Sequence, residues 1–140
     1  MTQQDLYDFI SRNPIAVLST ASSTGEPEAA LMRVAVTPQL ELFFDTRIET
    51  RKYRNFLANP RCALVIGCTG PASIQYEGVL EIPDPAELAR LQDLYFEGAT
   101  SESRARSAGR TDVAWLVARP RWLRYSGYSQ RPPASEEFTF

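Results

Sequence analysis

The chain has no histidine among its 140 residues, and it has only two cysteines. The lack of histidine excludes Ser-His and Cys-His nucleophile pairs, histidine acid–base catalysis, and the usual side-chain ligand of zinc or haem. Cys62 and Cys68 fall on one expected strand, so their Cα atoms would lie ~20 Å apart, beyond disulfide reach. Both are expected to be small buried apolar residues. If the protein performs chemistry, we expect an organic cofactor to carry it.

The chain also lacks an excess of charge of either sign, since 15 Lys and Arg residues face 17 Asp and Glu residues. This balance argues against general affinity for nucleic acid or acidic membranes. The start of the chain, MTQQDLYDFI, lacks the basic residues and apolar run of a signal peptide. No segment approaches the ~20 apolar residues of a membrane span. The expectation is a cytoplasmic protein that binds neither nucleic acid nor membrane.

Length and composition indicate one domain with a real core, because 44% of the residues are hydrophobic and 11% are aromatic. We expect this domain to cover residues 1–128 and a proline-containing tail to cover residues 129–140. The sequence contains neither internal repeats nor a linker that would separate two domains.

Apolar periodicity and turn residues divide the chain into short elements. Helices are predicted over three segments: Asp5–Arg12, Thr50–Asn59 and from Pro85 to about Tyr95. Strands are predicted over seven segments: Ile15–Thr20, Glu28–Thr37, Leu40–Asp45, Cys62–Cys68, Ser73–Ile82, Val113–Arg119 and Trp122–Tyr125. The polar, basic segment Ala99–Arg110 has no apolar period, so it is expected to be a mobile loop or a weak helix.

The order of these elements indicates the fold class. Strands that follow one another in runs are typical of antiparallel sheets, whereas a doubly wound sheet requires strict alternation of strand and helix. The predicted fold is therefore mainly β with peripheral α: a small antiparallel barrel of six or seven strands, with short helices around it.

The most informative stretch is LFFDTRIETRKYRNFLANP, residues Leu42–Pro60. Thr50 is a good N-cap for the predicted helix. Arg51 and Lys52 then lie at the helix N-terminus, whose partial positive charge disfavours cations. Backbone N–H groups, a hydroxyl and two cations at one place are typical of a phosphate site. The alternative is that both cationic side chains extend into solvent.

Several short motifs, in this order along the chain, resemble the pyridoxamine 5′-phosphate oxidase-like, FMN-binding split β-barrel family. The resemblance covers about Asp5 to Tyr125. It rests on these residues taken together: Gly25 and Pro27, Phe43-Phe44-Asp45-Thr46, Thr50-Arg51-Lys52, Asn59-Pro60-Arg61, and Gly78. The resemblance implies an antiparallel split barrel and a homodimer that binds two FMN molecules at the subunit interface.

The resemblance also implies which residues bind the flavin. The Ser/Thr-Arg-Lys element of the family binds the phosphate, and it corresponds to Thr50, Arg51 and Lys52. Two residues at a strand end lie along the flavin, and they correspond to Asp45 and Thr46. A strand segment follows the isoalloxazine ring largely through backbone groups, and it corresponds to Ala30, Leu31, Met32, Arg33, Val34 and Ala35. A glutamine on a later strand corresponds to Ser73, for which Gln75 on the same face is an alternative.

The chain departs from the oxidase at several of these positions. Basic residues at the two ends of the ring-contacting segment are replaced by Ala30 and Ala35, and the histidine-containing carboxy-terminal signature is absent. These departures argue against a vitamin B6 oxidase, because a shared fold does not transfer substrate specificity. The expected function is an FMN-dependent oxidoreductase for an unidentified small molecule, with a reduced nicotinamide or an organic substrate as electron donor.

Some residues and functions keep more than one interpretation. Arg33 either contacts the flavin or forms an interface salt bridge with Glu41 or Glu77. Asp45 either contacts the flavin or caps a turn. Four aromatic residues either form a wall over the flavin or pack in the core and at an interface: Trp115, Trp122, Tyr125 and Tyr128. Two other functions stay open, a module that binds or stores a cofactor without turnover and a cofactor-free dimeric interaction domain.

Overall fold

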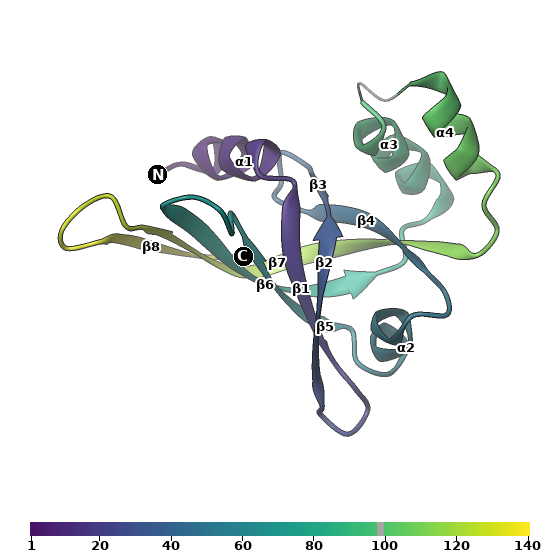
Figure 1. Ribbon diagram of the computed structural model, residues 1–140, viewed down its shortest axis with the longest axis horizontal. Helices are drawn as coiled ribbons and strands as arrows, with labels where there is room; N and C mark the ends of the chain where they lie inside the picture. Colours follow the sequence, from purple (N-terminus) through teal and green to yellow (C-terminus); the bar gives the residue numbers. More distant parts are fainter. Residues whose placement is uncertain (98–99) are drawn as a thin grey trace.

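The computed structural model describes residues 1–97 and 100–140, which form one antiparallel sheet with helices at its margins (Figure 1). The strands are β1 (Ile15–Ala21), β2 (Pro27–Arg33), β3 (Ala35–Val36), β4 (Leu42–Arg47), β5 (Arg61–Ile66), β6 (Ala72–Glu81), β7 (Val113–Gly127) and β8 (Ala134–Thr139). The helices are α1 (Gln3–Arg12), α2 (Arg51–Ala58), α3 (Pro85–Tyr95) and α4 (Ser101–Ala108). The predicted fold class, mainly β with peripheral α, is confirmed, and the described residues form eight strands instead of six or seven.

The long strand β7 joins the two halves of the sheet. The strand order is β2-β1-β5-β6-β7-β4-β3, and β8 pairs with β7 beside this path. One end of β7, residues 113–118, pairs with β4, whereas the other end, residues 122–127, pairs with β8. Figure 1 shows the β7–β8 ribbon extending away from α3 and α4. The sheet curls into a half-barrel, which is the split barrel that the resemblance implies.

The inner face of the curled sheet holds the core. Leu18, Leu64, Tyr76 and Leu123 form one row across β1, β5, β6 and β7, and none of them is more than 2% exposed. Residues on the opposite face of the same strands alternate with this row, as the period of a strand requires. The sheet therefore has a buried inner face and an open outer face.

The helix α1 adds to the core from the N-terminal side. Thr2 caps it, and Asp5 completes a capping box by accepting the backbone N–H of Thr2 at 2.7 Å. Its apolar face places Leu6 and Ile10 in the core, where they are 0% and 1% exposed. The prediction of a helix at this end is confirmed.

The predicted strand Glu28–Thr37 is divided in the structure. β2 ends at Arg33, and the short strand β3 begins at Ala35. Between them, the backbone N–H of Val34 donates to the carbonyl of Pro14 at 2.8 Å. At this point the chain passes from β2, at one end of the strand order, to β3 at the other end.

The predicted break at Pro120 is absent, because β7 runs through it. Proline has no N–H for the ladder, but it is tolerated where a bulge interrupts the pairing. The pairing with β6 shifts between Glu77 and Gly78, which leaves Arg121 as the extra residue of a bulge. Gly78 faces this irregularity, and a Cβ there would lie 2.5 Å from the carbonyl oxygen of Arg119.

Two further elements add to the predicted ones. The sequence analysis assigns no strand to residues 129–140, yet Ala134–Thr139 pair with β7 as β8. Residues Ser101–Ala108 form the helix α4, in the segment Ala99–Arg110 for which a mobile loop or a weak helix was open. Ala99 itself lies outside the described residues. No residue of α4 is buried, which explains the missing apolar period.

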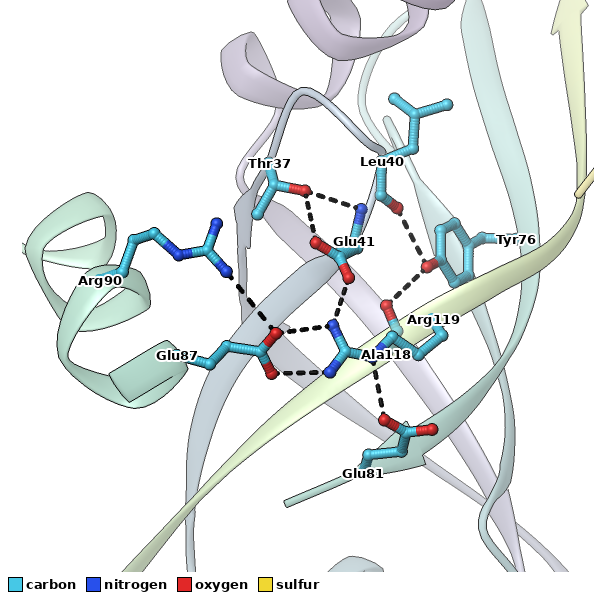
Figure 2. A network of polar contacts seen from close by, with 9 residues as sticks. All are labelled: Thr37, Leu40, Glu41, Tyr76, Glu81, Glu87, Arg90, Ala118 and Arg119. Carbon is cyan, nitrogen blue, oxygen red and sulfur yellow. Dashed lines mark hydrogen bonds and ion pairs between the residues drawn. The ribbon is translucent and has the colours of Figure 1, made fainter. Parts of the chain in front are cut away.

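The helix α3 is attached to the barrel through Arg119, whose guanidinium contacts three carboxylates (Figure 2). Nη2 donates to Glu87 of α3 at 2.6 Å, and Nε donates to Glu81 at the end of β6 at 3.0 Å. Glu41, just before β4, is the third partner. The hydrogen bonds to Glu87 contribute most to raising the pKa of Arg119, so the guanidinium stays charged. The cluster holds α3 beside β4.

We expect Gly78→Ala to lower the free energy of unfolding by roughly 1–3 kcal/mol, because overpacking a tight site costs about that much. The new methyl group would overlap the Arg119 carbonyl and the Tyr76 ring. Urea unfolding followed by circular dichroism measures the effect. Gly70→Ala is the matched control, since nothing lies within 4 Å of a Cβ there. Equal stability of the two variants would contradict the close approach of β7 to β6.

Candidate cofactor site

The start of α2 brings together the groups that the sequence predicts for an anion site. Thr50 is the N-cap, and its hydroxyl accepts the backbone N–H of Tyr53 at 3.4 Å. The same hydroxyl lies 3.0 Å from that of Thr46, which is buried at the end of β4. The first turn contains no acidic residue and carries Arg51 and Lys52. A hydroxyl, helical N–H groups and two cations therefore lie at one place.

Two hollows meet at Lys52. The first, here the Ala30 hollow, has a volume of about 180 Å³ and lies against β1 and β2, with Glu28, Ala30, Arg51 and Lys52 on its wall. The second, here the Asp45 hollow, has a volume of about 220 Å³ and lies between β2, β4 and the start of β7. Its wall includes Met32, Asp45, Thr46, Thr50, Lys52 and Arg110. Lys52 is half-buried and forms no ion pair with any described residue, so its ammonium is available to both hollows.

Arg51 is more exposed than Lys52 and already has an ion-pair partner. Its side chain is 76% exposed, and its Nε lies 3.5 Å from a carboxylate oxygen of Glu28. An exposed pair of this kind contributes ~0–1 kcal/mol, so Arg51 can exchange this partner for another anion at little cost. Glu28 also lowers the positive charge of the Ala30 hollow, an effect that the sequence analysis did not foresee.

The predicted ring-contacting segment is mostly an edge strand. β2 lies at one end of the sheet, so one side of its backbone has no partner strand among the described residues. Ala30 and Met32 each line one of the two hollows, whereas Leu31 is 70% exposed on the outer face. Val34 is buried in the core, and Ala35 lies in β3. The backbone available to a ligand is therefore that of residues 30–33.

Arg33, Tyr95 and Asp45 lie near one another where α3 approaches the site. The guanidinium carbon of Arg33 is 5.3 Å from the centre of the Tyr95 ring, a cation–π distance. Burial raises the pKa of Tyr95 and the negative charge of Asp45 raises it further, whereas Arg33 acts in the opposite direction. The phenol therefore stays neutral and presents a hydrogen-bonding group beside two charges.

Within one chain, the described residues form neither a salt bridge from Arg33 to Glu41 or Glu77 nor a turn capped by Asp45. Among the described residues Arg33 forms no salt bridge with Glu41 or Glu77, and Glu41 is bound to Arg119 instead. Asp45 lies within β4, opposite Trp115 of β7, so it caps no turn. Asp45 faces the hollow that also contains Thr46 and Lys52.

The four aromatic residues do not form a single wall in one chain. Trp115 stacks on Phe43 at 4.9 Å between ring centres and belongs to the core beneath α3. Trp122 lies on the outer face of the sheet, and Tyr125 packs edge-on against α1. Tyr128 is 62% exposed. Core and surface packing therefore account for these residues within one chain.

Ser73 and Gln75 are not brought to the start of α2. Both lie on β6, and neither lines the Ala30 or the Asp45 hollow. Gln75 pairs with Val65 of β5 and lines a separate hollow of about 310 Å³ on the outer face.

The two cysteines differ in burial. Cys62 is buried, as expected, and burial raises the pKa of its thiol to about 12. Cys68 is exposed because it lies past the end of β5, so the expectation that it is buried is wrong.

In the described part of the chain no cluster of three or more His, Cys, Asp or Glu side chains is placed to hold a metal ion. The helices in that part are too short or too polar to span a membrane.

Arg110 is a residue of the site that sequence reasoning missed. It follows α4 and lines the Asp45 hollow together with Thr50 and Lys52 at the start of α2. No local pattern marks it, because only the pairing of β4 with β7 brings it to Thr50 and Lys52. Arg47, at the end of β4, lines the same hollow.

A family model described as pyridoxamine 5′-phosphate oxidase matches residues 2–127, which is most of the chain. The chain belongs to the pyridoxamine 5′-phosphate oxidase family. This agrees with the resemblance seen in the sequence, and the match includes all the predicted flavin-binding residues. A search of curated proteins finds no match.

Solved structures share the fold of the family member described here. A heme binding protein from Mycobacterium smegmatis has a TM-score of 0.80 and 18% identity, and the match covers 99% of this chain and 58% of that one. The heme storage protein HutZ from Vibrio cholerae has a TM-score of 0.72 and 14% identity, covering 97% and 92%. A pyridoxamine 5′-phosphate oxidase-related, FMN binding protein from Nostoc punctiforme has a TM-score of 0.71 and 10% identity, covering 98% and 95%. At these identities the likeness concerns the fold alone.

We expect Thr50→Ala to lower the free energy of unfolding by about 1 kcal/mol, because it removes the N-cap of α2. It also removes the polar neighbour of the buried Thr46 hydroxyl. Guanidinium chloride unfolding followed by tryptophan fluorescence measures this. Thr100→Ala is the control, because it uncaps α4, which contributes no residue to the core. A larger loss in the control than in Thr50→Ala would contradict the importance of the α2 start.

Proposed function

We propose that this protein binds FMN, with the phosphate at the start of α2. The observation that carries the proposal is Lys52, a half-buried cation with no ion-pair partner among the described residues, placed beside two hollows and a helix N-terminus. The helix dipole makes this an unfavourable position for a cation unless an anion accompanies it. A phosphate monoester offers that anion, with several acceptor oxygens for Thr50, Arg51, Lys52 and the backbone N–H groups.

The flavin ring then lies along β2. The free edge of β2 offers backbone groups of residues 30–33, and Ala30 leaves space beside them. Met32 offers a polarisable apolar contact and Asp45 a hydrogen-bond acceptor. These groups fit a planar ring that carries N–H donors at one edge, as the isoalloxazine does.

We also propose that the protein is a homodimer with each flavin between two subunits. The outer face of the sheet supports this. Leu31, Val17 and Val65 form one row across β2, β1 and β5, and Leu31 and Val65 are 70% and 40% exposed. An apolar row of this kind is unusual on a monomer surface and typical of an interface. Ser73 and Gln75 lie on the same side of β6, so in the dimer they would face the other subunit.

The proposed activity is FMN-dependent oxidation or reduction of a small molecule. Bound FMN would supply the hydride or electron transfer. The side chains would anchor the phosphate, hold the ring and exclude water from one of its faces. The neutral phenol of Tyr95 and the charges of Arg33 and Asp45 lie where a substrate would approach the ring.

A non-catalytic cofactor-binding or storage protein is the second candidate. It is favoured by the two solved structures that are described as heme binding and heme storage proteins. The absence of histidine argues against an ordinary axial haem ligand in this chain. Addition of reduced nicotinamide to the FMN-loaded protein separates the candidates. Consumption of reduced nicotinamide in excess of the bound flavin, with dissolved oxygen as the electron acceptor, supports the oxidoreductase, and an unchanged flavin spectrum with every donor tried supports a carrier.

We expect Lys52→Ala to weaken FMN binding about 10- to 100-fold, because a hydrogen bond to a charged group is worth about 1.5–3 kcal/mol. Titration of FMN fluorescence measures the affinity. Arg54→Ala is the matched control, since this exposed cation lies on the same helix but lines neither hollow. Unchanged affinity in Lys52→Ala, or an equal loss in Arg54→Ala, would remove the proposed phosphate site.

We expect Val65→Lys to convert the dimer to a monomer, because it places a charge at one end of the apolar row on the outer face, at a side chain that is 40% exposed. Size-exclusion chromatography with light scattering measures the mass. Leu57→Lys is the control, because Leu57 is 67% exposed on α2, away from that face. A monomeric wild-type protein, or a Val65→Lys variant that stays dimeric, would contradict the proposed interface.

A further inference from the structure

Arg110 enters the candidate site from a distant part of the chain. It lies between α4 and β7 and lines the Asp45 hollow, whose other walls come from β2, β4 and the start of α2. The pairing of Arg47 with Val113 joins the end of β4 to the start of β7 and fixes this approach. Three cationic side chains therefore line the hollow: Arg47, Lys52 and Arg110.

The guanidinium of Arg110 is held at one nitrogen only. Its Nε donates to a carboxylate oxygen of Asp112 at 3.4 Å, and no described residue bonds its two terminal nitrogens. The other oxygen of Asp112 lies 3.4 Å from Nε of Arg47. The hydrogen bond from Arg110 is the main cause of the lowered pKa of Asp112, so this carboxylate stays ionised. Arg110 thus contacts Asp112 through Nε alone, and its terminal N–H groups have no hydrogen-bond partner among the described residues.

The charges around the hollow call for an anion. Asp112 is shared between two arginines, and Asp45 is the one carboxylate among the described residues that line the hollow itself. Lys52 and Arg110 line the same hollow, and an anion bound there would offset the repulsion between their charges. A guanidinium with two free N–H₂ groups matches the oxygens of a phosphate in bidentate fashion, which an ammonium does not.

We infer that Arg110 is a phosphate-binding residue of the flavin site, contributed by the segment between α4 and β7. This inference rests on the proposed FMN binding and extends it. Lys52 supplies a point charge from the helix start, and Arg110 supplies the fork that selects a phosphorylated flavin over one that lacks the phosphate.

Binding of the phosphate to Arg110 also stabilises the position of α4. This helix buries no residue, and its Arg104 attaches it to α3 by an ion pair with Asp93 at 2.6 Å and a cation–π contact with Phe96 at 5.7 Å. Such exposed contacts are weak, so α4 opens easily in the absence of ligand. Phosphate binding at Arg110 fixes the chain just after the C-terminal end of α4, and this holds α4 against α3.

The test compares FMN with riboflavin, which has the same ring and no phosphate. In wild-type protein we expect FMN to bind more tightly. Arg110→Ala should weaken FMN binding roughly tenfold or more and leave riboflavin binding unchanged, as expected for loss of a charge-assisted phosphate contact. Arg110→Lys should restore part of the loss. Arg106→Ala is the matched control, because this exposed arginine lies on α4 and outside the hollow, and it should bind both flavins as the wild type does.

A second readout follows α4 directly. Trypsin cleaves after Arg104 and Arg106, so the rate of cleavage reports on opening of this helix. FMN should slow the cleavage in wild-type protein, whereas riboflavin should not, and FMN should give no protection in Arg110→Ala.

The outcomes separate this inference from the proposed function. If wild-type protein binds FMN and Arg110→Ala binds it equally well, the role of Arg110 is overturned and the flavin site stands. Equal losses of FMN and riboflavin in Arg110→Ala would also overturn it, because the residue would then act on the ring or the fold. If the wild type binds neither flavin, the proposed function and the inference fail together.

Discussion

The attachment of α2 to the barrel is the interaction on which the candidate site depends. A helix of eight residues is not stable alone in water, so its contacts must fix its position. The buried amide of Asn55 donates to the hydroxyl of Thr20 in β1 at 3.1 Å, and Thr50 contacts Thr46 of β4. These two polar contacts hold the helix at its middle and at its start. They place Lys52 where β1, β2 and β4 leave two hollows.

The helix α3 and the strand β7 complete the surroundings of the start of α2. The Arg119 cluster ties α3 to β4 and β6 (Figure 2). The helix α3 in turn brings Tyr95 to Arg33. The long strand β7 pairs with β4, and this pairing brings the preceding residue Arg110 to the Asp45 hollow. The site is therefore built from segments that lie far apart in the sequence.

Local sequence signals predicted the parts of the site that are local. Thr50, Arg51 and Lys52 stand in one helical turn, where capping and the helix dipole give each residue type a meaning. Arg110 carries no such signal, because its role comes from the β4–β7 pairing. Pro120 misled the strand prediction, since a bulge opposite Gly78 accommodates it. In β8, ASEEFT, the weak apolar alternation hides a strand that forms only because β7 offers an edge.

The most direct test of the account is the binding of FMN by the wild-type protein. Absorption spectra of the purified protein, followed by equilibrium dialysis against FMN, give both the cofactor and its stoichiometry. The account requires a yellow protein, or saturable binding of one FMN per chain with the spectrum of a flavin in a protein environment. A colourless protein that shows no saturable uptake of FMN would contradict it and leave the cations at the start of α2 without an explanation.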